Sequence, residues 1–258
     1  MTSRKIRIET ENAPPSTGFR SQGLIAGGIF FGAGQIGAEM PEPGVLRQPS
    51  EGMAESVRIT LDHLLQVTRA AGLNHDSVFE VAAYPKVVGS KAIIQKEIVD
   101  YLGSEPLLFT YHEVFDVAMH AMIEMDWMAV TGDGLSKQEA AEIMAPLGND
   151  TVGEAISSGP FVMWNKLAGH GKDLGEASDT LLTDLAQRLA DVGCSPADLV
   201  KLTVYLKAFD PYPMFNEATK QHFAQIIPPA RSVLVAPAIT GDAHITIDVV
   251  ALRSDSAS

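Results

Sequence analysis

The stretch PPARSVLV, residues 228–235, decides the fold and places one charge in an unusual position. The diproline ends any helix before it, and the apolar residues after it predict a half-buried strand. Arg231 is therefore expected to stand as a fixed cation at the mouth of a sheet. A guanidinium group in that setting is suited to bind a carboxylate through two parallel hydrogen bonds in one plane. The plainer alternative is a surface arginine with a salt-bridge partner.

The features around this stretch occur twice in the chain, which indicates an internal repeat. Three pairs lie 121 positions apart and three lie 122 apart: Gly72 with Gly193, Tyr84 with Tyr205, Lys86 with Lys207, and then Pro106 with Pro228, Asp126 with Asp248 and Ala129 with Ala251. A one-residue insertion explains the change of offset. Each half then reads as a strand or hairpin, a helix, a strand, a helix and two strands. Helices on one sheet face make an α+β fold, and the uncovered face predicts that the halves pair or that the chain oligomerises.

Glycine and proline residues punctuate residues 131–155 and interrupt the repeat. Within this segment, SKQE at 136–139 has the spacing of a capping box, which predicts a short helix over residues 137–144. The expected organisation is a first domain over residues 1–130, a linker over 131–155 and a second domain over 156–258.

Apolar periodicity places the elements of each half. Helices are predicted over residues 50–71, with Ser50 as the N-cap, and over 90–102, 178–192 and 214–225. Strands are predicted over 6–10, 77–84, 107–117, 121–130, 159–167, the end of 197–207, 232–236 and 245–252, with a strand or hairpin over 23–31. The run GAGQIG at 32–37 lacks the lysine and the following helix of a phosphate loop. Its glycines therefore indicate a bulge or a close backbone approach.

Composition excludes several classes of protein. The 258 residues are 46% hydrophobic and 20% charged, an ordinary globular balance, and the net charge is -13. This acidity disfavours nucleic-acid and anionic-membrane surfaces. One cysteine, Cys194, excludes an internal disulfide and fits a reducing compartment. The start of the chain shows no signal-peptide pattern, and no apolar run reaches the ~20 residues that cross a bilayer, so a soluble, cytoplasmic protein is expected.

Three sets of residues resemble the YjgF/RidA family, whose members have the chorismate-mutase-like fold. They are TENAPP at 10–15 with GQI at 34–36, RAAGL at 69–73 with ADVG at 190–193, and PARS at 229–232 with ITIDVVA at 245–251. The resemblance covers both halves and leaves out the linker. It implies two tandem domains of this fold, each with two helices on one sheet face. Family members are usually homotrimers, so a homo-oligomer, with a trimer of two-domain chains favoured, is expected.

The resemblance also implies a chemistry. The best-known family activity hydrolyses reactive imines and enamines to 2-oxoacids and ammonia, without a metal or cofactor. If the roles of the family's residues apply to this chain, Arg231 binds the substrate carboxylate and Asn216 adds a polar contact. Asp248 stands where the family commonly has a glutamate. Tyr205 is a further substrate-binding candidate. Such hydrolysis depends on orientation and on acid–base help, which contributes ~100- to 10,000-fold.

The first half departs from this pattern, because the repeat places Phe109 where Arg231 stands. The strand predicted there carries Tyr111, His112 and Glu113, with Tyr111 and Glu113 on one face and His112 on the other. One interpretation is a rebuilt site in which His112 or Glu113 acts as acid or base and Tyr111 and Phe109 contact the substrate. The alternative is that Tyr111 and His112 are core or interface residues.

Two functions from different classes follow. The first is a deaminase or hydrolase for a small carboxylate-bearing imine, enamine or amino-unsaturated acid, for instance a 2-aminomuconate-like compound. The second is a non-catalytic protein that binds small carboxylates or a partner on a degenerate scaffold, which the missing arginine and the Asp248 replacement favour. A ribonuclease is disfavoured, because phosphate binding is driven largely by basic side chains.

Overall fold

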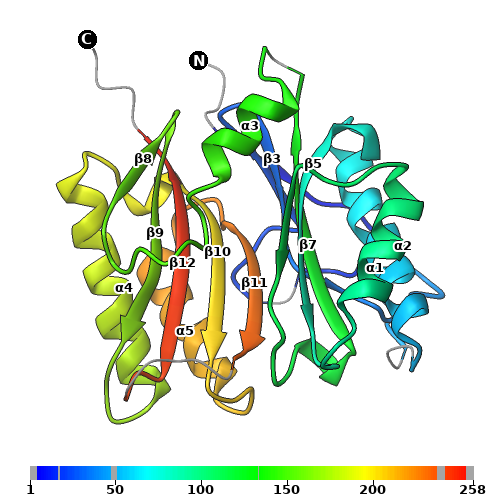
Figure 1. Cartoon of the computed structure of the whole chain (residues 1–258). Helices are drawn as coiled ribbons and strands as arrows, with labels where there is room; N and C mark the ends of the chain where they lie inside the picture. Colours follow the sequence, from blue (N-terminus) through cyan, green and yellow to red (C-terminus); the bar gives the residue numbers. More distant parts are fainter. Residues whose placement is uncertain (1–4, 17, 48–50, 133, 237–241, 254–258) are drawn as a thin grey trace.

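The computed structural model describes residues 5–16, 18–47, 51–132, 134–236 and 242–253. Two sheets face each other, and each carries two helices on the side turned away from the other sheet (Figure 1). The predicted α+β class with two tandem sheet units is therefore confirmed. The N-cap predicted at Ser50 lies outside the described residues.

The first sheet has seven strands in the order β1-β2-β3-β7-β5-β6, with β4 paired to β7. Its strands are β1 (Lys5–Ile8), β2 (Gly23–Ala26), β3 (Ile29–Gly32), β4 (Gln35–Ile36), β5 (Val78–Pro85), β6 (Leu108–Tyr111) and β7 (Ile123–Val130). Helices α1 (Met53–Ala70) and α2 (Lys91–Leu102) belong to this half. The strands β5 and β6 are parallel, and α2 is the crossover that joins them.

The second sheet has five strands in the order β11-β10-β12-β9-β8. Its elements are β8 (Ile156–Ser158), β9 (Phe161–Gly169), α4 (Leu174–Asp191), β10 (Leu199–Leu206), α5 (Tyr212–Phe223), β11 (Ala230–Val235) and β12 (Ile245–Leu252). Here α5 joins the parallel strands β10 and β11, as α2 does in the first sheet. The short turns η1 (His75–Ser77), η2 (Ala118–His120) and η3 (Pro196–Asp198) complete the described elements.

The bounds of these elements confirm the repeat. Strand β10 begins 121 positions after β5, and α5 begins 121 positions after α2. Strand β12 begins 122 positions after β7. The two halves are therefore copies of one unit, joined by α3 (Lys137–Met144). That helix spans the predicted residues, and Ser136 and Glu139 form the predicted capping box at its start.

Three of the predicted element boundaries differ from the structure by about three residues or more. Helix α1 begins at Met53 with Gly52 as its N-cap, and α4 begins at Leu174 because Asp173 accepts a hydrogen bond from the Glu176 N–H. The strand predicted over residues 107–117 ends at Tyr111. Beyond that residue the His112 and Val114 N–H groups still donate to Ala83 O and Pro85 O of β5, at 3.1 and 2.9 Å, and the Phe115 N–H then donates to Val235 O of the second sheet at 2.7 Å.

Apolar side chains fill three layers. In the outer layers, helices α1 and α2 pack on the first sheet and α4 and α5 on the second. The middle layer joins the two sheets with α3. At its centre the rings of Phe31 and Phe161 meet edge to face, with centroids 5.6 Å apart. Each sheet thus covers the face that the other leaves open, which confirms the predicted pairing of the halves.

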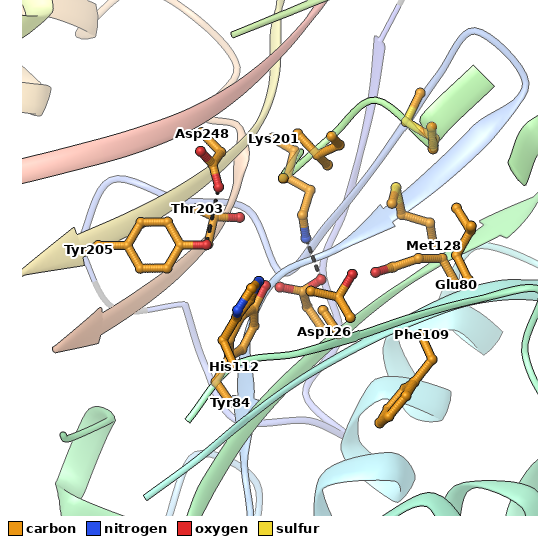
Figure 2. A pocket seen from close by; sticks show the side chains of 16 residues that line it. Glu80, Tyr84, Phe109, His112, Asp126, Met128, Lys201, Thr203, Tyr205 and Asp248 are labelled. Carbon is orange, nitrogen blue, oxygen red and sulfur yellow. Dashed lines mark hydrogen bonds and ion pairs between the residues drawn. The ribbon is translucent and has the colours of Figure 1, made fainter. Parts of the chain in front are cut away.

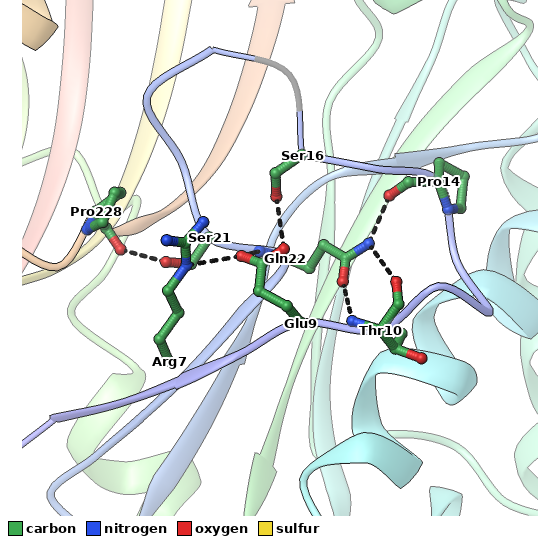
Figure 3. Close-up of polar contacts among 8 residues, drawn as sticks. All are labelled: Arg7, Glu9, Thr10, Pro14, Ser16, Ser21, Gln22 and Pro228. Atoms are coloured by element: carbon green, nitrogen blue, oxygen red, sulfur yellow. Dashed lines mark hydrogen bonds and ion pairs between the residues drawn. The ribbon is translucent and has the colours of Figure 1, made fainter. Parts of the chain in front are cut away.

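The N-terminal segment is held against both halves (Figure 3). The Gln22 side chain accepts from the Thr10 N–H at 2.6 Å and donates to Pro14 O at 2.7 Å. Next to it, the Ser21 hydroxyl donates to Pro228 O at 2.6 Å, and the Ser21 N–H donates to Pro229 O at 3.1 Å. These bonds tie the loop before β2 to the diproline that opens β11.

None of the helices in the described part of the chain has the length and apolar composition needed to span a bilayer.

We expect Phe161→Ala to destabilise the pairing of the sheets, because it removes a fully buried ring from the middle layer. The free energy of unfolding in a urea titration should fall by about 3–5 kcal/mol. The matched control is Phe115→Ala, whose ring is 65% exposed and which should leave stability nearly unchanged. Equal losses in the two variants would contradict this account of the middle layer.

Candidate functional site

The predicted site residues fall into two groups in the structure. Arg231 and Asn216 lie together on the α5 side of the second sheet. The other group lines cavities elsewhere between the sheets: Phe109, Tyr111, His112, Glu113, Tyr205 and Asp248. Arg231 and Asp248 therefore do not share a cavity, although the resemblance placed both in one site.

Arg231 is fully buried instead of standing at an open sheet mouth. Its Nη2 donates to the Tyr212 hydroxyl at 2.6 Å and to Asn216 Oδ1 at 2.7 Å. The guanidinium carbon lies 5.6 Å from the Tyr212 ring centroid and 5.4 Å from that of Phe215. Its Nε and Nη1 have no hydrogen-bond partner, and it forms no ion pair with any described residue. The surface salt bridge considered as an alternative is thus wrong, and a buried cation remains without a counter-ion.

A cavity of about 150 Å³ opens beside Arg231, between the two halves. We call it the Glu124 cleft. It is lined by Pro14, Pro15, Arg20, Gly34, Gln35, Ile36, Leu46, Ala118, Met119, Glu124, Phe209, Tyr212 and Val233. Tyr212 lines the cleft while bonding Arg231, which places the Arg231 guanidinium one side chain behind the cleft wall.

Glu124, on β7 of the first half, brings a carboxyl group to this cleft. Its Oε1 accepts from the Val233 N–H at 3.2 Å, a bond between the two halves. Burial raises the pKa of Glu124 to about 7, and the Arg20 guanidinium opposes that rise. A carboxyl group with a pKa near neutrality can accept or donate a proton at physiological pH.

Gly34 makes room for this carboxyl group. A Cβ at position 34 would fall 1.9 Å from Glu124 Oε1, so the backbone of the glycine-rich run lies directly on the carboxylate. The close backbone approach predicted for this run is therefore confirmed, and the phosphate-loop alternative receives no support.

Arg20 supplies a second guanidinium at the cleft. Its Nη1 donates to Gly34 O at 3.0 Å, and its Nε has no hydrogen-bond partner. The bonds of Ser21 to the diproline fix the chain immediately after it. The cleft thus combines a titratable carboxyl group with the Arg20 guanidinium in its wall, and the Arg231 guanidinium lies behind Tyr212. Both guanidinium groups keep unpaired N–H donors.

The internal repeat shows that Arg231 and Glu124 are both specific to their own half of the chain. Arg231 corresponds to Phe109 in the first half, and Glu124 corresponds to Thr246 in the second, each at an offset of 122. Neither group is therefore needed by the fold at its position. The two departures from the repeat nevertheless meet at one cleft, and each comes from a different half.

The second group of predicted residues is organised around Asp248. Its Oδ1 accepts from the Lys166 N–H at 2.8 Å, and its Oδ2 accepts from the Tyr205 hydroxyl at 3.1 Å. Burial raises the pKa of the Asp248 carboxyl. Lys166 has a φ of 55°, a backbone conformation that disfavours a side chain, so this contact holds a strained residue.

His112 and Glu113 lie just after the end of β6, and their N-terminal neighbour Tyr111 ends that strand. The Tyr111 hydroxyl donates to Glu113 Oε1 at 3.0 Å, so this pair shares a side, as the alternation along a strand predicts. The imidazole of His112 stacks on the Tyr84 ring, with centroids 6.5 Å apart. Phe109 lies beside Tyr111, with centroids 6.3 Å apart.

These residues line two cavities that share His112, Tyr205 and Asp248. The outer cavity, of about 540 Å³, also has Tyr111, Glu113, Asp150 and Lys166 in its wall. The inner cavity, of about 120 Å³, lies between the sheets and is shown in Figure 2. Its further polar side chains are Glu80, Tyr84, Thr110, Asp126, Lys201 and Thr203.

The described residues contain no group of three histidine, cysteine or acidic side chains placed to hold a metal ion.

Sequence reasoning missed Glu124, Arg20 and Tyr212. A signal existed for Glu124, because a charged residue two positions before Asp126 within a buried strand is unusual. Arg20 lies in a loop whose position is set by the bonds of Ser21 and Gln22, and no local pattern reveals such contacts.

Comparison with known proteins identifies relatives of both sequence and structure. Residues 155–253 match the family model described as Endoribonuclease L-PSP. A RutC family protein of Pyrococcus horikoshii is 29% identical over 122 residues, which are 47% of this chain and 94% of the relative. Another, of Synechocystis, is 33% identical over 72 residues, which are 28% of this chain and 55% of the relative.

Two crystal structures from E. coli are similar to about half of the chain. The YjgF gene product is 23% identical with a TM-score of 0.44, over 49% of this chain and 98% of that one. TdcF with bound serine is 21% identical with a TM-score of 0.44, over 49% of this chain and 99% of that one. The second half of the chain, residues 155–253, is thus similar to the Endoribonuclease L-PSP family, and about half of the chain is similar to a RutC family protein.

Proposed function

We propose that the chain is a deaminase that hydrolyses a small carboxylate-bearing imine or enamine in the Glu124 cleft. The observation that carries this proposal is the meeting of Arg231 and Glu124 at one cleft, although each is missing at the corresponding repeat position. The resemblance of the chain to the YjgF/RidA family supports the reaction class.

The cationic side chains supply the substrate carboxylate with donors. Arg20 lines the cleft with an unpaired Nε–H, and the Tyr212 hydroxyl beside it is held by Arg231. A carboxylate bound here offsets the buried charge of Arg231, which otherwise lacks a counter-ion. Charge-assisted hydrogen bonds to a guanidinium also fix the orientation of a planar carboxylate.

Glu124 supplies the acid–base chemistry. A water molecule adds to the carbon of the protonated imine while the ionised Glu124 carboxylate accepts its proton. Protonated Glu124 then donates that proton to the carbinolamine nitrogen, and ammonia leaves as the C=O bond forms and the hydroxyl proton passes to the Glu124 carboxylate. The products are a 2-oxoacid and ammonia, so atoms and charge balance without an oxidant or reductant. The raised pKa of Glu124, about 7, makes both its ionised and its protonated forms available during this sequence.

A carboxylate-binding protein without turnover is the second candidate. The enclosure of Arg231 by Tyr212, Phe215 and Asn216 favours it, because a ligand must displace Tyr212 to reach the guanidinium directly. The ribonuclease activity in the name of the family model receives no support from the acidic composition, with a net charge of -13.

We expect Glu124→Gln to lower kcat/KM for imine hydrolysis roughly 100- to 10,000-fold, because the amide cannot accept the proton of water. The imine is generated in situ from an L-amino acid with an amino-acid oxidase, and ammonia and 2-oxoacid release are followed. The matched control is Glu113→Gln, in the outer cavity, which should retain wild-type turnover. Loss of activity in the control with full activity in Glu124→Gln would move the reaction to the other cavity.

The pH dependence of kcat/KM should reflect the ionisation of the Glu124 carboxyl group. Because the ionised form acts as the base, kcat/KM is expected to rise with pH through about 7 and then to level off. Glu124→Gln should remove this limb from the profile. The range from pH 5.5 to 8.5 extends about one and a half pH units on either side of that pKa. A wild-type kcat/KM that stays constant over this range would exclude Glu124 as the base.

Arg231→Ala should abolish ammonia release and weaken binding of a 2-oxoacid such as 2-oxobutanoate by about 10- to 100-fold, the range for charge-assisted hydrogen bonds. Binding is measured by calorimetry, and circular dichroism establishes that the variant is folded. Arg47→Ala, which removes a guanidinium 65% exposed at the surface, is the matched control. Wild-type binding without any turnover would select the carboxylate-binding function, and unchanged turnover in Arg231→Ala would reject the deaminase.

A further inference from the structure

The inner cavity between the sheets contains polar atoms that the fold leaves without partners. Glu80, on β5, is 5% exposed and lines this cavity. Its Oε2 has no hydrogen-bond partner. Figure 2 shows its carboxyl group directed toward Asp126, across the cavity from Tyr205 and Asp248. A buried carboxyl oxygen without a donor indicates either an energetic cost of the fold or a place for a ligand.

Two further groups surround the same space. The Tyr84 hydroxyl has no hydrogen bond to a described residue, although its ring is buried beside Glu80, Asp126, Tyr205 and Asp248. The Thr203 side chain lines the cavity from β10 of the other half. The polar groups that line the cavity therefore come from both sheets.

The wall of the inner cavity carries more carboxyl groups than ammonium groups. Carboxyl groups of Glu80, Asp126 and Asp248 line the cavity, and Lys201 is the ammonium group among them. Lys201 Nζ is engaged by Asp126 Oδ1 at 2.5 Å, and the other oxygen of Asp126 accepts from the Ser232 hydroxyl. Glu80 and Asp248 form no ion pair with a described residue, although Lys201 acts on Glu80, and His112 and Lys166 act on Asp248, through their charges.

We propose that the inner cavity binds a small primary ammonium ion, with Glu80 as its main acceptor. The N–H donors of such an ion match Glu80 Oε2 and the hydroxyl oxygens of Tyr84 and Thr203, and its charge matches the acidic wall. The volume of about 120 Å³ fits a head of a few heavy atoms. A longer substituent can extend past His112 into the outer cavity of about 540 Å³.

This site is separate from the Glu124 cleft. The two cavities share no lining residue, and the guanidinium groups of the cleft select an anion whereas the inner cavity selects a cation. The proposal therefore stands whether or not the cleft hydrolyses imines.

Binding should depend on pH through Glu80. Burial, followed by the charge of Asp126, raises the pKa of Glu80 to about 8, while Lys201 and a contact from Thr110 oppose this. Tyr84, Tyr205, Asp248 and His112 are the other titratable groups that face the cavity. A cation binds the ionised form of Glu80 more strongly than the neutral form, so affinity increases as pH rises through about 8 and the protein releases a proton.

The experiment is calorimetric titration of the full chain with methylammonium chloride at pH 6.5 and 8.5 and constant ionic strength. If only ionised Glu80 binds, the affinity should increase roughly 25-fold between these two values. Tetramethylammonium, which has no N–H donor, should give no saturable heat. Equal affinity at the two pH values, or no methylammonium binding at either, would overturn the proposal.

Four variants locate the site. Glu80→Gln should bind methylammonium weakly and with no pH dependence. The matched control Glu154→Gln changes an exposed carboxylate, and Glu124→Gln changes the other cleft, and both should bind as the wild type does. If Glu80→Gln does not fold, Thr203→Val replaces it and should also weaken binding. Wild-type binding in Thr203→Val and Glu80→Gln, or loss of binding in Glu124→Gln, would place the cation elsewhere.

Discussion

The buried ion pair between Asp126 and Lys201 fixes how the two sheets face each other. Asp126 comes from β7 of the first half, and it accepts from Lys201 of β10 and from Ser232 of β11 in the second half, each at 2.5 Å. The Asp126 side chain is fully buried and that of Lys201 is 3% exposed. Removing one partner of such a pair costs about 3–5 kcal/mol, whereas replacing the whole pair by apolar residues is often neutral. Its contribution here is therefore to exclude other alignments of the sheets more than to stabilise this one.

That alignment places the chemistry of the cleft. Glu124 precedes Asp126 by two positions and so points from the same strand face, where it accepts from the Val233 N–H. Arg231 and Val233 are likewise two positions apart, on the opposite face of β11 from Ser232. The packing of β7 against β11, which belong to different sheets, thus sets the carboxyl group, the guanidinium and the ion pair together. A slip of one residue in the pairing of β7 with β5 would turn Glu124 into the outer layer and remove the cleft.

The fold was largely predictable, because it depends on periodic patterns and on a repeat. The offset of 121 and 122 positions recovered both units, and the capping box at Ser136 located α3. The site was less predictable, because it is built between the halves. Pairing Arg231 with Asp248 followed from their shared half, but the carboxyl group nearest to Arg231 comes from the other half. The separation of the predicted residues into two groups could not be foreseen without the relative placement of the sheets.

Duplication explains why the two sides of the molecule differ so completely. A single unit that assembles with identical copies must carry its arginine and its carboxylate at every interface. In a chain with two joined copies, each interface has its own residues, so Arg231 with Glu124 can occupy one side while Phe109 with Thr246 occupies the other. Asp248 is then free to bind Tyr205 and the strained Lys166 backbone. The acidic inner cavity depends on the same freedom, because Lys201 of one half pairs with Asp126, while Glu80 and Asp248 form no ion pair with a described residue.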